Sequence, residues 1–202
     1  MKLVLRFCVL VVFLVMGGCD SGHKMSPLPA DGVVLAFGDS LTYGTGAPRE
    51  QSYPAVLAKL LGRKVVNAGI PGEITVEGLE RLPALLKKHR PALVVLCHGG
   101  NDFLHRLDRQ TTIDNLHRMI EQVVEARIRL VLVGVPKLGF GLDVPELYQQ
   151  AADRYKVPFE DEILVDLLSD SAMKSDTIHP NAAGYQRMAE AIYRVIEKAQ
   201  KR

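Results

Sequence analysis

The sequence predicts an α/β fold in which a parallel β-sheet is covered by helices on both faces. Two observations lead to this prediction. Short apolar runs alternate with longer segments of helical periodicity, a pattern typical of a parallel sheet with right-handed crossovers. The apolar residues within each short run are consecutive rather than alternate, which indicates strands buried on both sides. With 202 residues, 48% of them hydrophobic, the chain is large enough for one domain with its own core.

The apolar runs and the helical patterns place the elements in order along the chain. Strands are predicted at 33–37, 64–68, 92–97 and 130–135, with a weaker fifth near Val157. Helices are predicted at 52–61, 75–89, 111–127 and 145–155. The last helix, 181–198, has apolar residues at helical spacing on one face, which indicates packing against the core.

The first 19 residues differ in composition from the rest of the chain. Lys2 and Arg6 precede a wholly apolar stretch, 7–16, and Gly-Gly-Cys19 follows it. A basic start, an apolar stretch and small residues before a cleavage point form the three-part pattern of a secretion signal. A transmembrane anchor is less favoured, because ten apolar residues fall short of the roughly 20 that span a bilayer as a helix. The expected organisation is a lipoprotein signal peptide at 1–18, a lipidated cysteine and tether at 19–30, and a globular domain at 31–202.

The ending at Cys19 resembles the bacterial lipobox, in which a cysteine is lipidated and becomes the new N-terminus. This resemblance implies a lipid anchor that holds the protein in the bacterial cell envelope, facing the periplasm or the cell exterior. Asp20 resembles an inner-membrane retention signal. The alternative is an ordinary signal peptide that is cut nearby.

Charge and cysteine content give no support to a nucleic-acid partner or to an intramolecular disulfide. Loss of Lys2 and Arg6 with the signal brings the formal net charge from +2 to zero, so nothing in the electrostatics favours a nucleic-acid partner. Cys97 would be left without an intramolecular disulfide partner, and its place at the end of an apolar run predicts a small buried residue.

Polar and glycine residues follow each of the first three predicted strands. Gly38-Asp39-Ser40 follows the first, 67–72 the second, and Gly99-Gly100-Asn101-Asp102 the third. On its own, Gly-Asp-Ser is an ordinary turn. The carboxyl ends of parallel strands meet at one edge of a sheet, however, and ligands bind there. We therefore expect these three segments to lie together.

Asp176 and His179 could supply the acid–base chemistry that a serine nucleophile requires. Acyl transfer from serine needs a base within hydrogen-bond reach and a group that fixes the tautomer of that base. A three-residue spacing in a turn lets a carboxylate fold back onto one imidazole nitrogen while the other faces the serine. The tetrahedral intermediate also needs hydrogen-bond donors for its oxyanion.

Four blocks of the sequence, in order, resemble those of the SGNH (GDSL) hydrolases, and especially the thioesterase I, lysophospholipase L1 and arylesterase group. They are Gly38-Asp39-Ser40-Leu41, Gly69, Gly100-Asn101-Asp102 and Asp176-x-x-His179-Pro180. The resemblance implies a flavodoxin-like, three-layer α/β/α sandwich around a five-stranded parallel sheet, with no metal or cofactor.

The same resemblance implies roles for particular residues. Ser40 would be the nucleophile, His179 the general base and then acid, and Asp176 the partner that orients His179. The backbone amides of Ser40 and Gly69, with the side chain of Asn101, would form the oxyanion hole.

Two other features compete for a place in the site. Asp102 and His105 have the same Asp-x-x-His spacing and form a rival pair. His98 either touches the site or is a structural histidine.

The expected function is a serine esterase acting on small acyl esters or lysophospholipids, including aryl esters and thioesters. The segment 136–145 alternates apolar with small or polar residues, so Leu138, Phe140 and Leu142 are candidates for the wall of an acyl pocket. The alternative is a surface loop that tucks these residues onto the core. The alternative functions are a carbohydrate O-deacetylase and a catalytically silent envelope lipoprotein.

Overall fold

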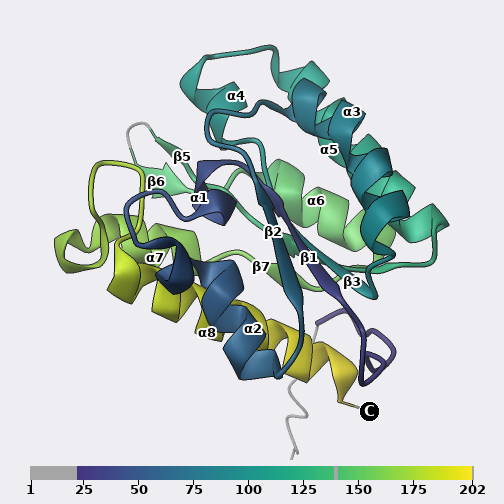
Figure 1. The fold of residues 1–202 in the computed structure, drawn as a ribbon. Helices are drawn as coiled ribbons and strands as arrows, with labels where there is room; N and C mark the ends of the chain where they lie inside the picture. Colours follow the sequence, from purple (N-terminus) through teal and green to yellow (C-terminus); the bar gives the residue numbers. More distant parts are fainter. Residues whose placement is uncertain (1–21, 139–140, 202) are drawn as a thin grey trace, which may run out of the picture.

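The computed structural model describes residues 22–138 and 141–201 and shows a five-stranded parallel sheet (Figure 1). The strand order is β2-β1-β3-β4-β7, and every neighbouring pair is parallel. The strands are β1 (Val34–Gly38), β2 (Val65–Gly69), β3 (Leu93–Cys97), β4 (Arg129–Val133) and β7 (Phe159–Glu160). The predicted strands are confirmed, with one shift. The fifth strand begins after Pro158, which has no N–H to donate, while the Pro158 carbonyl accepts from the Leu132 N–H at 2.9 Å.

Helices cover both faces of the sheet, which confirms the three-layer prediction (Figure 1). One layer contains α2 (Tyr53–Leu61) and α8 (Ala182–Gln200), with α7 (Ile163–Ser169) beside α8. The other contains α3 (Thr75–His89), α5 (Arg109–Glu125) and α6 (Glu146–Tyr155). The elements that the sequence did not predict are α7, α1 (Ser40–Tyr43), α4 (Gly100–Leu104), a hairpin of β5 (Lys137–Leu138) and β6 (Leu142–Asp143), and 3-10 turns at Arg49–Gln51 and Ser171–Met173.

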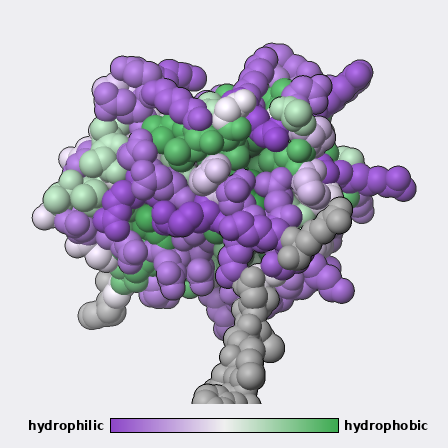
Figure 2. Space-filling model, turned by 90° about the horizontal axis from the view of Figure 1, so that it is seen from below, coloured by the Kyte–Doolittle hydropathy of each residue, from purple (hydrophilic) through white to green (hydrophobic). Residues whose placement is uncertain are grey.

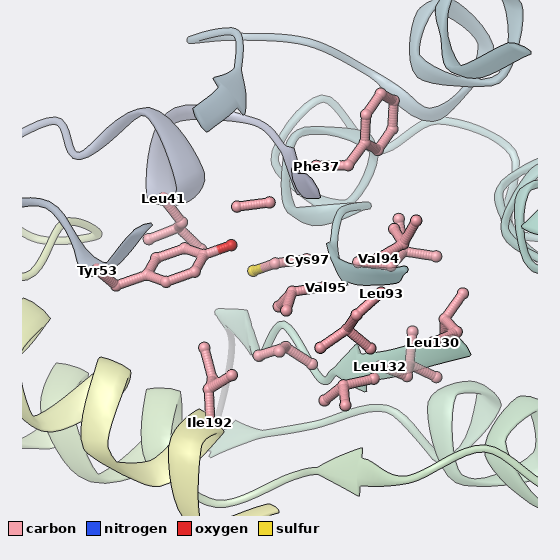
Figure 3. Packing of buried hydrophobic residues seen from close by; sticks show 14 of the residues in the cluster. Phe37, Leu41, Tyr53, Leu93, Val94, Val95, Cys97, Leu130, Leu132 and Ile192 are labelled. Carbon is pink, nitrogen blue, oxygen red and sulfur yellow. The ribbon is translucent and has the colours of Figure 1, made fainter. Parts of the chain in front are cut away.

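The core lies between the sheet and these helices. Residues of β1 and β3 are fully buried, and side chains of the sheet pack toward Ile192 of α8 (Figure 3). Cys97 lies at the end of β3 near Tyr53, as Figure 3 shows. Burial raises the pKa of the Cys97 thiol well above its usual value, so the thiol stays neutral and the prediction of a small buried residue is confirmed.

The segment 22–30, predicted as a tether, instead packs against the domain. Leu28 is buried, its N–H donates to the Gln200 side chain at 2.7 Å, and the Met25 N–H donates to the Ala199 carbonyl at 2.9 Å. The guanidinium of Arg129 donates to the carbonyls of Ser26 and Pro27. These contacts fix the segment beside the C-terminus, at the end of the sheet opposite α1 and α4 (Figure 1).

The side of the molecule opposite the α1 and α4 end is mainly hydrophilic, with apolar side chains in separate patches (Figure 2). None of the described helices is long and apolar enough to cross a membrane. Cys19 and Asp20, predicted to carry the anchor and its retention signal, lie outside the described residues.

Candidate active site

Ser40 is presented by a tight turn between β1 and α1. Asp39 caps the helix, since its Oδ1 accepts from the Leu41 N–H at 3.0 Å. The turn passes so close to β3 that a Cβ on Gly38 would collide with the Cys97 carbonyl. Glycine and aspartate are therefore required for the turn itself, and the turn places Ser40 at the carboxyl edge of the sheet.

Ser40, His179 and Asp176 form a continuous hydrogen-bonded relay. Nε2 of His179 lies 2.9 Å from the Ser40 Oγ, and its Nδ1 lies 2.8 Å from Oδ2 of Asp176. The other carboxylate oxygen of Asp176 accepts from the N–H groups of Ile178 and His179, both at 2.9 Å. The predicted fold-back of the carboxylate onto the imidazole is thus a compact turn held by three hydrogen bonds.

The electrostatics of the relay keep Asp176 ionised. Burial raises the pKa of Asp176, but hydrogen bonds from Ile178 and His179 outweigh this effect and hold the pKa below its usual value. An ionised Asp176 accepts the Nδ1 proton of His179, which leaves Nε2 free to accept the proton of the Ser40 hydroxyl.

Asn101 lies at the start of α4, buried beside the same turn. Its Nδ2 donates to the Glu73 carbonyl at 2.9 Å and makes a longer contact of 3.4 Å with Oδ2 of Asp39. Burial raises the pKa of Asp39, although the nearby His98 and the Leu41 N–H oppose the shift. Asn101 and Ser40 line one cavity, so the structure brings these two predicted residues together.

Gly69 does not join this site in the structure. Its N–H donates to Oδ1 of Asn67 at 3.0 Å, and Gly69 is not among the residues that line the cavity. A Cβ at this position would collide with the backbone of Tyr43. Gly69 is therefore needed for the close approach of β2 to α1, and its predicted place in the oxyanion hole is corrected.

Asp102 and His105 do not form a pair. The Asp102 carboxylate is buried, accepts the Thr75 N–H at 2.9 Å and hydrogen-bonds to the hydroxyls of Thr75 and Thr112. His105 is exposed at the C-terminal end of α4. The rival interpretation of this Asp-x-x-His spacing is therefore wrong.

His98 is a buried histidine bonded to Glu73, a residue that the sequence did not single out. Its Nε2 lies 3.1 Å from the Glu73 carboxylate, which also pairs with Arg81 at 2.6 and 2.7 Å. Burial raises the pKa of Glu73, but the hydrogen bonds from His98 and Arg81 prevail and lower it. Glu73 and Arg81 are eight residues apart, on a loop and on α3, and neither was predicted to lie near the site.

The relay opens into a cavity of about 190 Å³ whose lining combines polar and apolar side chains. Leu138 of β5 lines it, as predicted, whereas Leu142 of β6 lines a separate hollow. The reason is that β5 lies against α4 while β6 lies against α7. Phe140 is outside the described residues. The other lining residues are Asp39, Ser40, Leu41, Gly100, Asn101, Phe103, Leu104, Arg106, Val135, Pro136, Leu168, Ile178 and His179.

Among the residues that the structure describes, no group of three or more His, Cys, Asp or Glu side chains could hold a metal ion. The relay itself provides a hydroxyl, a base that accepts its proton and a carboxylate that orients the base. This arrangement is suited to nucleophilic attack on a carbonyl carbon.

Comparison with known proteins agrees with this geometry. Residues 36–187 match the model of the GDSL-like lipase/acylhydrolase family. The chain is 31% identical over 193 residues to Esterase TesA of Pseudomonas aeruginosa, covering 89% of this chain and 95% of that protein. It is 34% identical over 159 residues to thioesterase 1/protease 1/lysophospholipase L1 of Escherichia coli, covering 73% of this chain and 75% of that protein.

A solved structure shares the fold over nearly its whole length. The crystal structure of TesA superposes with a TM-score of 0.74 at 28% identity, covering 83% of this chain and 99% of that one. Since the family model spans most of the chain and the first of these relatives aligns over nearly all of it, the chain belongs to the GDSL-like lipase/acylhydrolase family and is an SGNH esterase.

Proposed function

We propose that this esterase hydrolyses carboxylic esters through an acyl-enzyme on Ser40, with His179 as the general base and acid and Asp176 as its orienting partner. The observation that carries the proposal is the relay of 2.8 and 2.9 Å hydrogen bonds from Asp176 through His179 to Ser40. A silent binding protein would have no need of this relay, in which each group is placed for proton transfer.

In the first half-reaction, the Ser40 Oγ bonds to the ester carbonyl carbon and its proton passes to Nε2 of His179. The carbon–oxygen bond to the alcohol then breaks, and the alcohol leaves with the proton from His179. In the second half-reaction, water attacks the acyl-enzyme and gives a proton to His179. Release of the acid returns that proton to Ser40, and Asp176 remains ionised throughout.

Two donors are available for the oxyanion that forms on the carbonyl oxygen. The Ser40 N–H begins α1, where a helix leaves its first amides without intrahelical partners. Nδ2 of Asn101 has one firm bond to the Glu73 carbonyl and one long contact to Asp39. An oxyanion can replace the long contact while the firm bond keeps the amide in place.

The cavity supports short to medium acyl esters, aryl esters and lysophospholipids as substrates, with thioesters as a further class. At about 190 Å³ it is smaller than typical ligand pockets of roughly 300–1,000 Å³, so only part of a substrate is enclosed. Leu104 and Leu138 are exposed at its rim, where a longer chain would lie. This apolar continuation favours acyl esters over an enzyme restricted to acetyl groups, such as a carbohydrate O-deacetylase.

For the location of the protein we propose the cell envelope, with a lipid anchor on Cys19. Because 22–30 is fixed to the far end of the sheet, the three Cα-to-Cα steps from Cys19 to residue 22 would span at most about 10 Å. The cavity would then face away from the anchoring membrane, which favours substrates that reach the enzyme through water. Labelling with a fatty-acid probe should mark the wild type and leave Cys19→Ser unmarked; an unlabelled wild type would refute the anchor.

The test of the reaction is hydrolysis of p-nitrophenyl acetate, butyrate and octanoate and of a lysophospholipid. We expect wild-type activity on the esters and only background with Ser40→Ala. A folded Ser40→Ala protein with full activity would refute the assignment of the nucleophile.

The same panel tests the acyl pocket. Leu138→Ala should lower kcat/KM for octanoate more than for acetate, because each buried methylene contributes up to about 0.8 kcal/mol. Leu142→Ala is the matched control from the opposite strand of the hairpin and should leave both esters unchanged. Equal losses of kcat/KM on acetate and octanoate with Leu138→Ala would contradict the acyl pocket and indicate a purely structural role for this segment.

A further inference from the structure

A buried ionic cluster lies directly behind Asn101. The Glu73 carboxylate is only 4% exposed, and the side chain of His98 is fully buried. The guanidinium of Arg81 donates two hydrogen bonds to Glu73, from Nε at 2.7 Å and from a terminal nitrogen at 2.6 Å. Nε2 of His98 lies 3.1 Å from the same carboxylate.

The orientation of His98 is set from its other side. Its Nδ1 accepts the Gly99 N–H at 2.9 Å, so the ring proton is on Nε2 and is donated to Glu73. The ring lies so close to α3 that a Cβ on Gly78 would collide with it. Arg81 also donates to the Ala68 carbonyl at 3.0 Å, and its guanidinium lies 4.3 Å from the centre of the Phe37 ring.

The cluster is coupled to Asn101 through one residue. The Glu73 side chain binds Arg81 and His98, while the Glu73 carbonyl accepts from Nδ2 of Asn101 at 2.9 Å. Arg81 comes from α3, and His98 directly follows β3, so the loop that carries Glu73 is held by two separate elements. Holding the carboxylate therefore also limits movement of the carbonyl that aligns the Asn101 amide.

Stability alone does not account for such a cluster. Buried ion pairs can often be replaced by apolar side chains of similar volume with no loss of stability, because removing charges from water is costly. The cluster does, however, hold a fixed acceptor for one of the two proposed oxyanion donors. Electrostatic stabilisation of a transition state depends on donors that are aligned before the reaction begins.

We propose that Glu73, clamped by Arg81 and His98, is a positioning residue that aligns the Asn101 amide with the oxyanion formed at Ser40. This inference rests on the proposed function. A residue that acts only through Asn101 should lower kcat and leave KM unchanged, and its effect should disappear once Asn101 is removed.

The experiment is a double-mutant cycle of Glu73→Gln and Asn101→Ala with p-nitrophenyl butyrate. Glutamine keeps the size of the side chain, but its NH2 group replaces one carboxylate oxygen and cannot accept, so at least one of the three hydrogen bonds from Arg81 and His98 is lost together with the negative charge. We expect Glu73→Gln alone to lower kcat by about tenfold to a hundredfold with KM changed less than about twofold. In the Asn101→Ala background, the same substitution should change kcat by less than about twofold.

Arg81→Lys provides a second variant that keeps the charge and loses the two-point contact. It should lower kcat by a smaller factor, again only when Asn101 is present. If Glu73→Gln fails to fold, the cycle of Arg81→Lys with Asn101→Ala decides the matter. The matched control is Glu121→Gln, which removes a carboxylate charge beside Tyr155 and Arg154, outside the candidate active site, and should leave kcat unchanged.

Equal losses in kcat with and without Asn101 would overturn the inference, as would a folded Glu73→Gln enzyme with wild-type kcat. Either result would leave Ser40-dependent hydrolysis intact in the wild type. Failure of the proposed function would appear differently, as a wild type whose hydrolysis does not depend on Ser40.

Discussion

The two sides of the candidate active site are built in different ways. The side that holds Asn101 is buried, and hydrogen bonds of Glu73, Asp102 and Thr75 connect it to α3, α5 and the sheet. The side that holds His179 is a surface turn, in which the Asp176 side chain is 51% exposed. Bonds within the turn hold it, such as that from the Ser175 N–H to the His179 carbonyl at 2.9 Å.

This difference corresponds to the two tasks of the site. Donors that stabilise charge gain from burial, because hydrogen bonds are stronger where water is excluded and the groups are already aligned. A base that activates water for deacylation must be accessible to the water molecule that attacks the acyl-enzyme. We therefore expect substitutions on the buried side to affect both rate and stability, and substitutions in the surface turn to affect rate far more than stability.

The largest effect is expected from His179→Ala. Loss of the base should lower kcat by about 10⁴ to 10⁶, since members of a triad act as a unit. The free energy of unfolding should change by about 1 kcal/mol or less, because the partner Asp176 is 51% exposed and can be hydrated once the bond is lost, although the His179 side chain itself is only 14% exposed. Ester hydrolysis and urea unfolding measure the two quantities. A loss of stability as large as that of the buried-side variants would remove the distinction between the two sides.

Asn101→Ala should have the next largest effect and should change both quantities. Loss of one oxyanion donor typically lowers kcat by about 10² to 10³. The free energy of unfolding should also fall, by about 1–3 kcal/mol, because the buried Glu73 carbonyl loses the Asn101 hydrogen bond. The same two assays apply. A variant with lowered kcat and an unchanged free energy of unfolding would contradict the prediction, because Asn101 would then behave like a residue of the surface turn.

Asp102→Asn tests the buried side without removing a proposed donor or acid–base group. The buried carboxylate accepts hydrogen bonds from Thr75 and Thr112, and its loss should lower the free energy of unfolding by about 1.5–3 kcal/mol. Asp108→Asn is the control, because that carboxylate caps α5 at the surface and the expected loss is about 1 kcal/mol or less. Equal losses in urea unfolding would contradict the prediction.

The smallest effect concerns the pH dependence of stability in the surface turn. The pKa of Asp176 in the folded chain lies below its usual value of 3.8, so its contribution to stability is present above pH 3.8 and is lost as pH falls through the lowered pKa. The difference in unfolding free energy between wild type and Asp176→Asn should therefore shrink between pH 5 and pH 3. Urea unfolding at both pH values checks this, and a difference that stays constant would show that the carboxylate is not stabilised in the fold.

Local features of the sequence were sufficient for the strands and for part of the site. The consecutive apolar residues of 93–97 predict a strand buried on both faces, because burial on both sides leaves no polar positions. Asp176 and His179 lie within one turn, so their spacing predicts their hydrogen bond without knowledge of the rest of the fold. Gly38 and Asp39 predict the turn that presents Ser40, since the turn needs these residue types.

Other contacts depend on segments that are far apart in the sequence and come together only in the folded chain. The Ser40–His179 bond joins residues 139 positions apart, and the resemblance to a family, rather than spacing, led to it. The Gly69 N–H donates to the Asn67 side chain instead of facing the site. Leu142 lines a different hollow from the cavity that Leu138 lines. Segment 22–30, predicted as a tether, packs against α8. The sequence raised His98 as a candidate but did not predict its partners, Glu73 and, through Glu73, Arg81.

The physical reason is the range of the interactions. Strand and turn patterns reflect burial and backbone geometry within a few residues, which the local sequence itself specifies. A hydrogen-bond partner depends on atoms that lie within about 3 Å and at a favourable angle. Only the packed sheet and helices place the Glu73 carboxylate between Arg81 and His98, and its carbonyl against Asn101.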